Sequence, residues 1–187
     1  MLNYNSVINE KINHNELSIR EISPIMKLNL RGKKKEFFTT VGKDLNMILP
    51  TEANTSSASD KLTSIWLSPD EWMIISNEKV QKDTNKYELQ ELLYNNISKT
   101  NLGAVTDISD QFVLFELEGK NIFELFASGS PFNFNEFKEK KGKTTQTLLN
   151  HIDVIIYHKD QNLVNLFVRR SFSEHLWSWI NDSASRL

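Results

Sequence analysis

The sequence predicts an α+β domain of two similar lobes, because one order of elements occurs twice along its 187 residues. Alternating apolar and polar residues on both sides of a turn predict two strands in "LSIREISPIMKLNLRG" (17–32) and again in "AVTDISDQFVLFELEG" (104–119). In each copy a helix, a hairpin and a second helix are predicted to follow. We expect a single domain over residues 1–187, which divides into a flexible tail (1–16), a first lobe (17–100) and a second lobe (101–187).

The first helix of each copy is bracketed by glycines. These helices are expected over 33–41 and 120–128, and each begins after a glycine and stops at another glycine ten residues further on. Gly42 and Gly129 are the closing glycines, and a left-handed residue that ends a helix is least strained when it is glycine. The equal spacing favours an internal duplication.

Two hairpins and a loop complete the predicted lobes. One hairpin covers 64–76 and turns at Ser68-Pro69-Asp70-Glu71, where proline suits the second place of a type I turn. The other covers 153–168 and turns around Lys159-Asp160. Residues 50–61 are poor in apolar side chains and are expected to form a mobile loop, and the first lobe is expected to end in a helix near 85–97.

Composition excludes several classes of protein. The net charge of −2 gives no electrostatic field for nucleic acid, and no apolar run approaches the roughly 20 residues of a membrane span. The first residues lack the features of a signal peptide. The absence of cysteine excludes disulfides and thiolate metal sites, and it suits a reducing compartment. We expect a cytoplasmic protein with no nucleic-acid or membrane partner.

The residues that could carry catalysis form no recognisable site. None of the four histidines has metal-ligand spacing, and His151 and His158, which flank a strand, are expected at the surface or at a sheet edge. Gly129-Ser130-Pro131 lacks the glycines and the lysine of a phosphate loop, and no Gly-x-Ser-x-Gly elbow occurs. The sequence therefore predicts no catalytic, cofactor-binding or metal-binding residue on this chain.

The stretch "RRSFSEHLWSWI" (169–180) is predicted to join a strand to the last helix. The preceding strand is apolar on nearly both faces and is expected at the centre of its sheet. Ser171 and Glu174 form a capping-box pair, so the helix is expected to start at Ser171. The residues predicted to face the core are Phe172, Leu176, Trp179 and Ile180.

Three residues of this stretch are candidates for contact with a partner protein. Arg169 and Arg170 lie where the strand meets the helix, and we expect one of them to pair with a carboxylate and the other to lie on the surface. Trp177 falls on a different helix face from Leu176 and Ile180, which indicates either packing at the edge of the core or an anchor for a partner. The partner-contact candidates are Arg169, Arg170 and Trp177.

Five motifs resemble the gamma subunits of heterotetrameric sarcosine oxidases. They are "WLSPDEWMIIS", "VTDISDQFVLFELEG", "GSPFNF", "TQTLL" and "RRSFSEHLWSWI", and the resemblance runs from about Ile22 to Ile180. Two positions depart from the family pattern: Ser68 stands where glycine is frequent, and Lys120 stands where proline is usual. Both residues are compatible with a turn and a first helical position.

The resemblance implies a fold like the folate-binding module of the glycine-cleavage aminomethyltransferase and a structural, non-catalytic role. It also implies that the chain assembles with alpha, beta and delta subunits, and that this assembly oxidises the N-methyl group of sarcosine. The implied products are glycine, hydrogen peroxide and formaldehyde, or the tetrahydrofolate adduct of formaldehyde. FAD, FMN, NAD and tetrahydrofolate are then expected on the larger subunits, and zinc on the smallest.

Three alternatives remain open at this point. The related N-methylglutamate dehydrogenase has a subunit to which these motifs are similar. A free-standing folate-binding protein of one-carbon metabolism would suit the implied fold, although no acidic residue can be placed in a folate pocket from the sequence. The third alternative is a scaffold protein without an enzyme partner.

Overall fold

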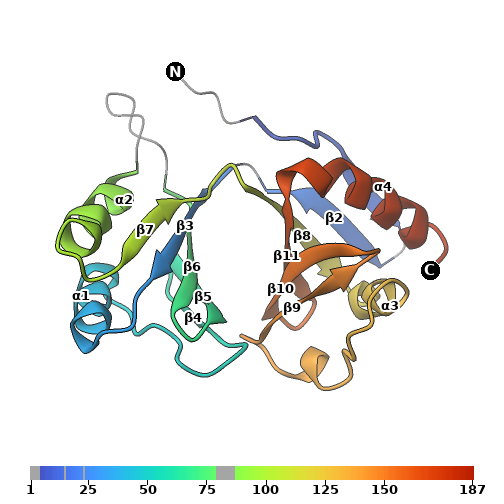
Figure 1. Cartoon of the computed structure of the whole chain (residues 1–187). Helices are drawn as coiled ribbons and strands as arrows, with labels where there is room; N and C mark the ends of the chain where they lie inside the picture. Colours follow the sequence, from blue (N-terminus) through green and yellow to red (C-terminus); the bar gives the residue numbers. More distant parts are fainter. Residues whose placement is uncertain (1–4, 15, 23, 79–86) are drawn as a thin grey trace. The chain divides into compact units, whose positions relative to one another are not determined.

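The computed structural model describes residues 5–14, 16–22, 24–78 and 87–187 of the chain. The chain forms two compact units, of which the first comprises residues 25–109. The second comprises residues 110–187 together with the described residues that precede Ile25. Each unit contains one antiparallel sheet and its own helices (Figure 1), so the α+β class is confirmed.

The first unit has a five-stranded sheet in the order β4-β5-β6-β3-β7. Its strands are β3 (Met26–Arg31), β4 (Ser56–Ala58), β5 (Leu62–Ser68), β6 (Glu71–Ser76) and β7 (Ala104–Asp107). Helices α1 (Lys35–Leu45) and α2 (Glu88–Leu93) accompany the sheet, and α2 continues into a π-helical turn, Tyr94–Ser98. The core between sheet and helices includes Leu28, Leu30, Phe37, Val41, Trp72, Ile74 and Leu93.

The second unit has a six-stranded sheet in the order β1-β2-β8-β11-β10-β9. Its strands are β1 (Lys11–His14), β2 (Leu17–Glu21), β8 (Phe112–Gly119), β9 (Thr144–Leu149), β10 (Ile152–Asp160) and β11 (Leu163–Arg169). Helices α3 (Ile122–Ala127) and α4 (Ser173–Ala184) contribute to the core, with 3-10 turns at Phe137–Glu139 and Arg170–Phe172. The central position predicted for the strand before Arg169 is confirmed, since β11 lies between β8 and β10.

The duplication seen in the sequence is present in the sheets, but the first strand of each copy lies in the other copy's sheet. Matched by their order, β4, β5, β6, β3 and β7 correspond to β9, β10, β11, β8 and β2. Strand β2 pairs with β8, and β7 pairs with β3. The compact units therefore differ from the expected lobes, 17–100 and 101–187. Strand β7 pairs with β3, 73–79 residues away, and β2 pairs with β8, 94–102 residues away.

The expected flexible tail is also corrected by the structure. Within it, β1 pairs with β2, and Ile12 is buried. The main-chain N–H groups of Val7 and Ile8 donate to the carboxylate of Glu21, over 3.3 and 2.6 Å. The described residues before β2 are thus held by a sheet ladder and by two hydrogen bonds to a carboxylate.

Neither of the glycines expected to close the first helix of each copy, Gly42 and Gly129, is a left-handed helix cap. Gly42 lies inside α1, and Asn46, with φ 47°, ends that helix in the left-handed conformation. Gly129 is not among the described residues with positive φ. An asparagine side chain can hydrogen-bond locally and tolerates this conformation, so the cap did not require glycine.

Other boundaries shift by a few residues. The segment 50–61, expected to be a mobile loop, contains the edge strand β4. The second hairpin turns at residues 161–162, two residues beyond the expected place, because β10 continues to Asp160. Of the helix expected near 85–97, residues 85 and 86 lie outside the described part, and the remainder begins at Glu88. None of the helices in the described part of the chain has the length and apolar character needed to cross a membrane.

Candidate interaction surface

Trp177 lies in the core of the second unit and is 6% exposed. Its ring packs against Phe115 of β8, with ring centroids 5.2 Å apart and an interplanar angle of 53°. Leu176 and Ile180 belong to the same buried cluster. The expectation that Trp177 is available to a partner is therefore wrong, because its indole fills the space between α4 and the sheet.

Trp179 and Phe172, both expected in the core, take more exposed positions. Trp179 is half-buried and covers Gly129, where an added Cβ would come within 2.4 Å of the indole ring. Phe172 is 48% exposed. Gly129 is thus required by the close approach of a tryptophan rather than by the end of a helix.

The start of α4 explains the exposed position of Phe172. Residues Arg170–Phe172 form a 3-10 turn, so α4 begins at Ser173 rather than at Ser171, and no side chain caps it. A 3-10 turn has three residues per turn instead of 3.6, which rotates the following side chains relative to a continuous α-helix. The buried stripe runs through Ser173, Leu176, Trp177, Ile180 and Ala184.

Arg170 is the arginine that pairs with a carboxylate. Its guanidinium donates to Asp110 Oδ1 over 2.8 Å and to the main-chain oxygen of Asn5 over 2.9 Å. Its own main-chain N–H donates to Gln111 O over 2.9 Å. These bonds join the end of β11 to two other segments of the second unit, so Arg170 is engaged within the chain.

Arg169 lies on the surface, as expected for one of the two arginines. It is exposed, and no hydrogen bond or ion pair joins its side chain to any residue that the structure describes. It borders a hollow of about 350 Å³ on the second sheet. The hollow is lined by Phe112, Gln146, Thr147, Leu148, Asp153, Val154, Ile155 and Arg169.

His158 is buried rather than at the surface or edge, which corrects the prediction. Its Nδ1 lies 3.2 Å from Phe137 O and 3.1 Å from Lys140 O, so Nδ1 carries the proton and donates to these carbonyls. Within the described chain Nε2 has no hydrogen-bond partner. The imidazole therefore holds the segment around the 3-10 turn Phe137–Glu139 against β10 and is a structural group.

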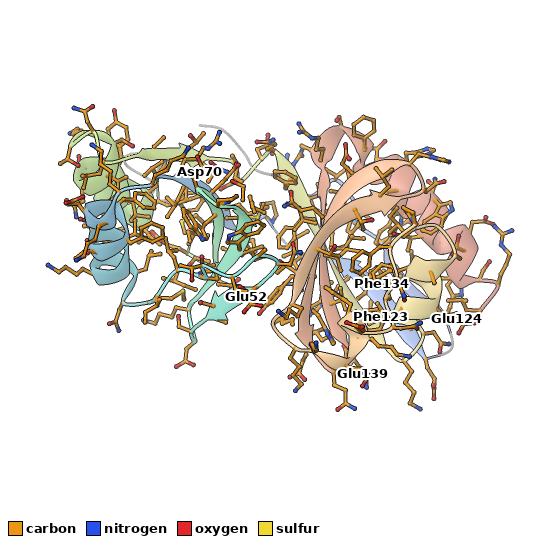
Figure 2. The ribbon with its side chains drawn as sticks, turned by 60° about the horizontal axis from the view of Figure 1, so that its bottom comes forward. Glu52, Asp70, Phe123, Glu124, Phe134 and Glu139 are labelled. Carbon is orange, nitrogen blue, oxygen red and sulfur yellow. The ribbon has the colours of Figure 1, made fainter. Side chains whose placement is uncertain are left out.

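Aromatic rings surround His158. Phe123 and Phe134, labelled in Figure 2, have ring centroids 6.0 Å apart. The His158 ring lies edge-to-face with Phe123 at 5.3 Å and stacks on Phe137 at 5.8 Å. The "GSPFNF" motif thus contributes Phe134 to a packed aromatic cluster, which accounts for its apolar residues.

A larger hollow, of about 740 Å³, lies in the first unit beside α2. Leu62, Leu89 and Leu92 contribute to its lining, together with several carboxylates. Among these, Glu78 accepts hydrogen bonds from the main-chain N–H groups of Glu88 and Leu89, over 2.6 and 3.3 Å. Glu78 therefore satisfies donors at the start of α2, and its position has a structural reason.

Carboxylates with a lowered pKa lie at hairpin turns. A hydrogen bond from the Ser68 hydroxyl lowers the pKa of Asp70, and the Lys141 ammonium lowers that of Asp160. A lowered pKa keeps a carboxylate charged, which suits an ion pair rather than a general acid at neutral pH. Across the residues that the structure describes, no group of three or more histidine or carboxylate side chains could hold a metal ion.

Comparison with known proteins gives a family model that matches residues 32–186 and is described as the sarcosine oxidase, gamma subunit family. The comparison with curated protein sequences gave no significant match. Several solved structures share the fold. One of them is heterotetrameric sarcosine oxidase from Corynebacterium sp. U-96 in complex with pyrrole 2-carboxylate, with a TM-score of 0.82 and 20% identity over 94% of this chain and 87% of that chain.

A second structure is the glycine cleavage system aminomethyltransferase T from Bartonella henselae. It has a TM-score of 0.59 and 14% identity over 92% of this chain and 50% of that chain. At these identities the two likenesses establish the fold. The fold implied by the sequence motifs is therefore confirmed.

Proposed function

The chain belongs to the sarcosine oxidase gamma subunit family, and we propose that it is a structural, non-catalytic subunit of a heterotetrameric sarcosine oxidase. The observation that carries this proposal is the match of the family model to residues 32–186, which is 155 of the 187 residues and includes part of both compact units. The similarity of fold to the Corynebacterium oxidase over 94% of the chain supports it. The partners in this proposal are alpha, beta and delta subunits.

The assembled enzyme, in this proposal, removes the N-methyl group of sarcosine by oxidation. Sarcosine, oxygen and water give glycine, formaldehyde and hydrogen peroxide, or the one-carbon unit is captured as 5,10-methylenetetrahydrofolate. The larger subunits hold FAD, FMN, NAD and tetrahydrofolate, and the smallest holds zinc. The assembly works in the cytoplasm, a location that suits a chain without cysteine.

The structural role predicts how the complex responds when this chain is left out. The partner subunits are expressed with and without it, and soluble yield, thermal stability and the flavin spectrum are measured. Without the chain we expect a lower yield or a less stable complex whose remaining flavin still oxidises sarcosine. Loss of sarcosine oxidation from an otherwise intact and fully flavinylated complex would contradict the non-catalytic role.

Ligand titration separates this proposal from a free-standing folate protein. The isolated chain is titrated with tetrahydrofolate, FAD and NAD in a calorimeter. We expect no binding at micromolar concentrations of any of the three. Micromolar binding of tetrahydrofolate would favour the folate-binding alternative.

A further inference from the structure

We propose that the second sheet carries a docking surface, the Arg169 surface, for a partner segment that presents a carboxylate beside an apolar side chain. The Arg169 surface consists of Phe112, Gln146, Leu148, Asp153, Ile155 and Arg169. The inference rests on the proposed function, because it assigns the occupant to a partner subunit of the oxidase.

Strand register places these six residues on one face of the sheet. Val113, Val154, Val168 and Leu149 belong to the core cluster with α3 and α4, and side chains alternate along a strand. Their neighbours in sequence therefore point to the opposite face. Arg169 pairs with Phe112, Asp153 with Leu148, and Ile155 with Gln146. Residues from β8, β9, β10 and β11 thus form one continuous surface.

The surface offers apolar contact. Leu148 is 39% exposed although it lies in a strand. Phe112, half-buried, lies on the same face beyond two intervening strands, with Asp153 and Arg169 between them. Ile155, only 7% exposed, lies deeper on the same face. A hollow of about 350 Å³ with these three residues in its lining has room for an apolar side chain. Burial of such a side chain is the usual source of affinity at the centre of an interface.

The charge of the surface indicates a carboxylate on the partner. The Arg169 side chain has no bonded partner among the residues described, whereas its neighbour Arg170 binds both Asp110 and a main-chain oxygen. A guanidinium matches a carboxylate through two parallel hydrogen bonds. Arg169 is therefore the group to which an acidic side chain would bind.

Asp153 determines how a charged partner would respond to mutations of the Arg169 surface. The register Val154 with Val168 places Asp153 opposite Arg169 on the neighbouring strand, yet no ion pair within 4.0 Å joins the two side chains. A partner carboxylate is attracted by Arg169 and repelled by Asp153. For an acidic partner segment, loss of the Arg169 charge should therefore weaken binding, and loss of the Asp153 charge should not. For a basic partner segment the two effects on affinity would be reversed.

The test measures the affinity of variant chains for the complex of the other subunits. We expect Arg169→Gln to raise Kd by about tenfold or more and to weaken the dependence of Kd on salt. Asp153→Asn should leave Kd unchanged or lower it, and Leu148→Ser should raise it severalfold. Arg186→Gln, which removes an exposed arginine paired with Asp182, is the matched control and should bind like the wild type.

The outcomes separate this inference from the proposed function. Wild-type binding with no effect of Arg169→Gln would overturn the inference and leave the gamma-subunit role intact. Weaker binding of Asp153→Asn, with Arg169→Gln unaffected, would assign the surface to a basic partner and also overturn it. Failure of the wild type to bind the other subunits would contradict the proposed function itself. Thermal unfolding of each variant shows whether its chain is folded.

Discussion

The ammonium of Lys27 is buried and donates a hydrogen bond to the main-chain oxygen of Ser109 over 2.9 Å. It also donates to Ile25 O over 3.1 Å, and the main-chain N–H of Lys27 donates to Ser109 Oγ over 3.0 Å. Ile25 is the first residue of the continuous first unit, and Ser109 is the last. Lys27 therefore ties together the two points at which the chain enters and leaves this unit.

Replacement of Lys27 should destabilise the chain. Lys27→Met keeps the length of the side chain but leaves a buried carbonyl group, Ser109 O, and a part-buried one, Ile25 O, without this donor. This should lower the free energy of unfolding by about 1–3 kcal/mol. Urea unfolding followed by circular dichroism measures the change. Lys120→Met, at an exposed pair with Glu16, is the control and should cost less than about 1 kcal/mol. Equal, small effects of the two changes would contradict the structural role of Lys27.

Removal of the Trp177 indole should open a cavity. Trp177→Ala is expected to lower the free energy of unfolding by about 3–5 kcal/mol, because the ring fills the core beside Phe115. Phe172→Ala, which removes a ring that is 48% exposed, should change it by no more than about 0.5 kcal/mol. Chemical denaturation of the isolated chain compares the two. A Trp177→Ala chain as stable as the wild type would show that the ring lies outside the core.

A glycine in the turn between β9 and β10 should stabilise the chain. Asn150 and His151 have φ of 48° and 63°, as in a two-residue hairpin turn of the primed kind, whose second place favours glycine. His151→Gly should stabilise the chain by up to about 1 kcal/mol, because a side chain in the left-handed region is strained. His151→Ala should give no gain, since alanine keeps the Cβ. Thermal unfolding decides between them, and equal stabilisation by both would exclude relief of backbone strain.

Asp70 should make stability depend on pH. The Ser68 hydroxyl, followed by Lys33 and Arg31, lowers the pKa of the Asp70 carboxyl in the folded chain. A carboxyl with a depressed folded pKa contributes stability above its unfolded pKa, about 3.9, and this contribution is lost as the pH falls through the folded value. Asp70 lies at the turn between β5 and β6 and is labelled in Figure 2.

The variant Asp70→Asn tests this dependence. At pH 7 its Tm should be below that of the wild type, and the difference should shrink as the pH falls below about 4. Differential scanning calorimetry between pH 7 and pH 2.5 follows the two proteins. A Tm difference that stays constant over this range would show that the carboxylate charge does not contribute.

Local patterns predicted much of the fold. Alternation identified the strands around Leu30 and Leu117, and the expected elements follow one another in both copies, but each copy has one further strand, β4 or β9, before its hairpin. Pairing across the chain could not be predicted, because the alternation of apolar and polar residues in β2 and β7 does not specify a partner strand. Only the complete sheets, in which β2 lies beside β8 and β7 beside β3, determine that exchange.

The candidate surface was predicted in part. The arginine doublet was recognised, but the sequence could not say which arginine pairs with Asp110, because that residue lies 60 positions away. The two tryptophans were exchanged, because Trp177 and Trp179 lie at nearly equal angles on either side of Leu176 and Ile180, so helical periodicity does not decide which of them faces the sheet. Burial of His158 depends on carbonyl groups of another segment and left no local signal.

Isolation of the complex through an affinity tag on this chain, followed by native mass spectrometry, tests whether the chain is a gamma subunit. We expect one assembly that contains a single copy of this chain and the three other polypeptides of a heterotetramer, with sarcosine-oxidising activity in the same fraction. Recovery of the chain alone, while a complete and equally stable sarcosine oxidase assembles without it, would contradict the proposed role as gamma subunit.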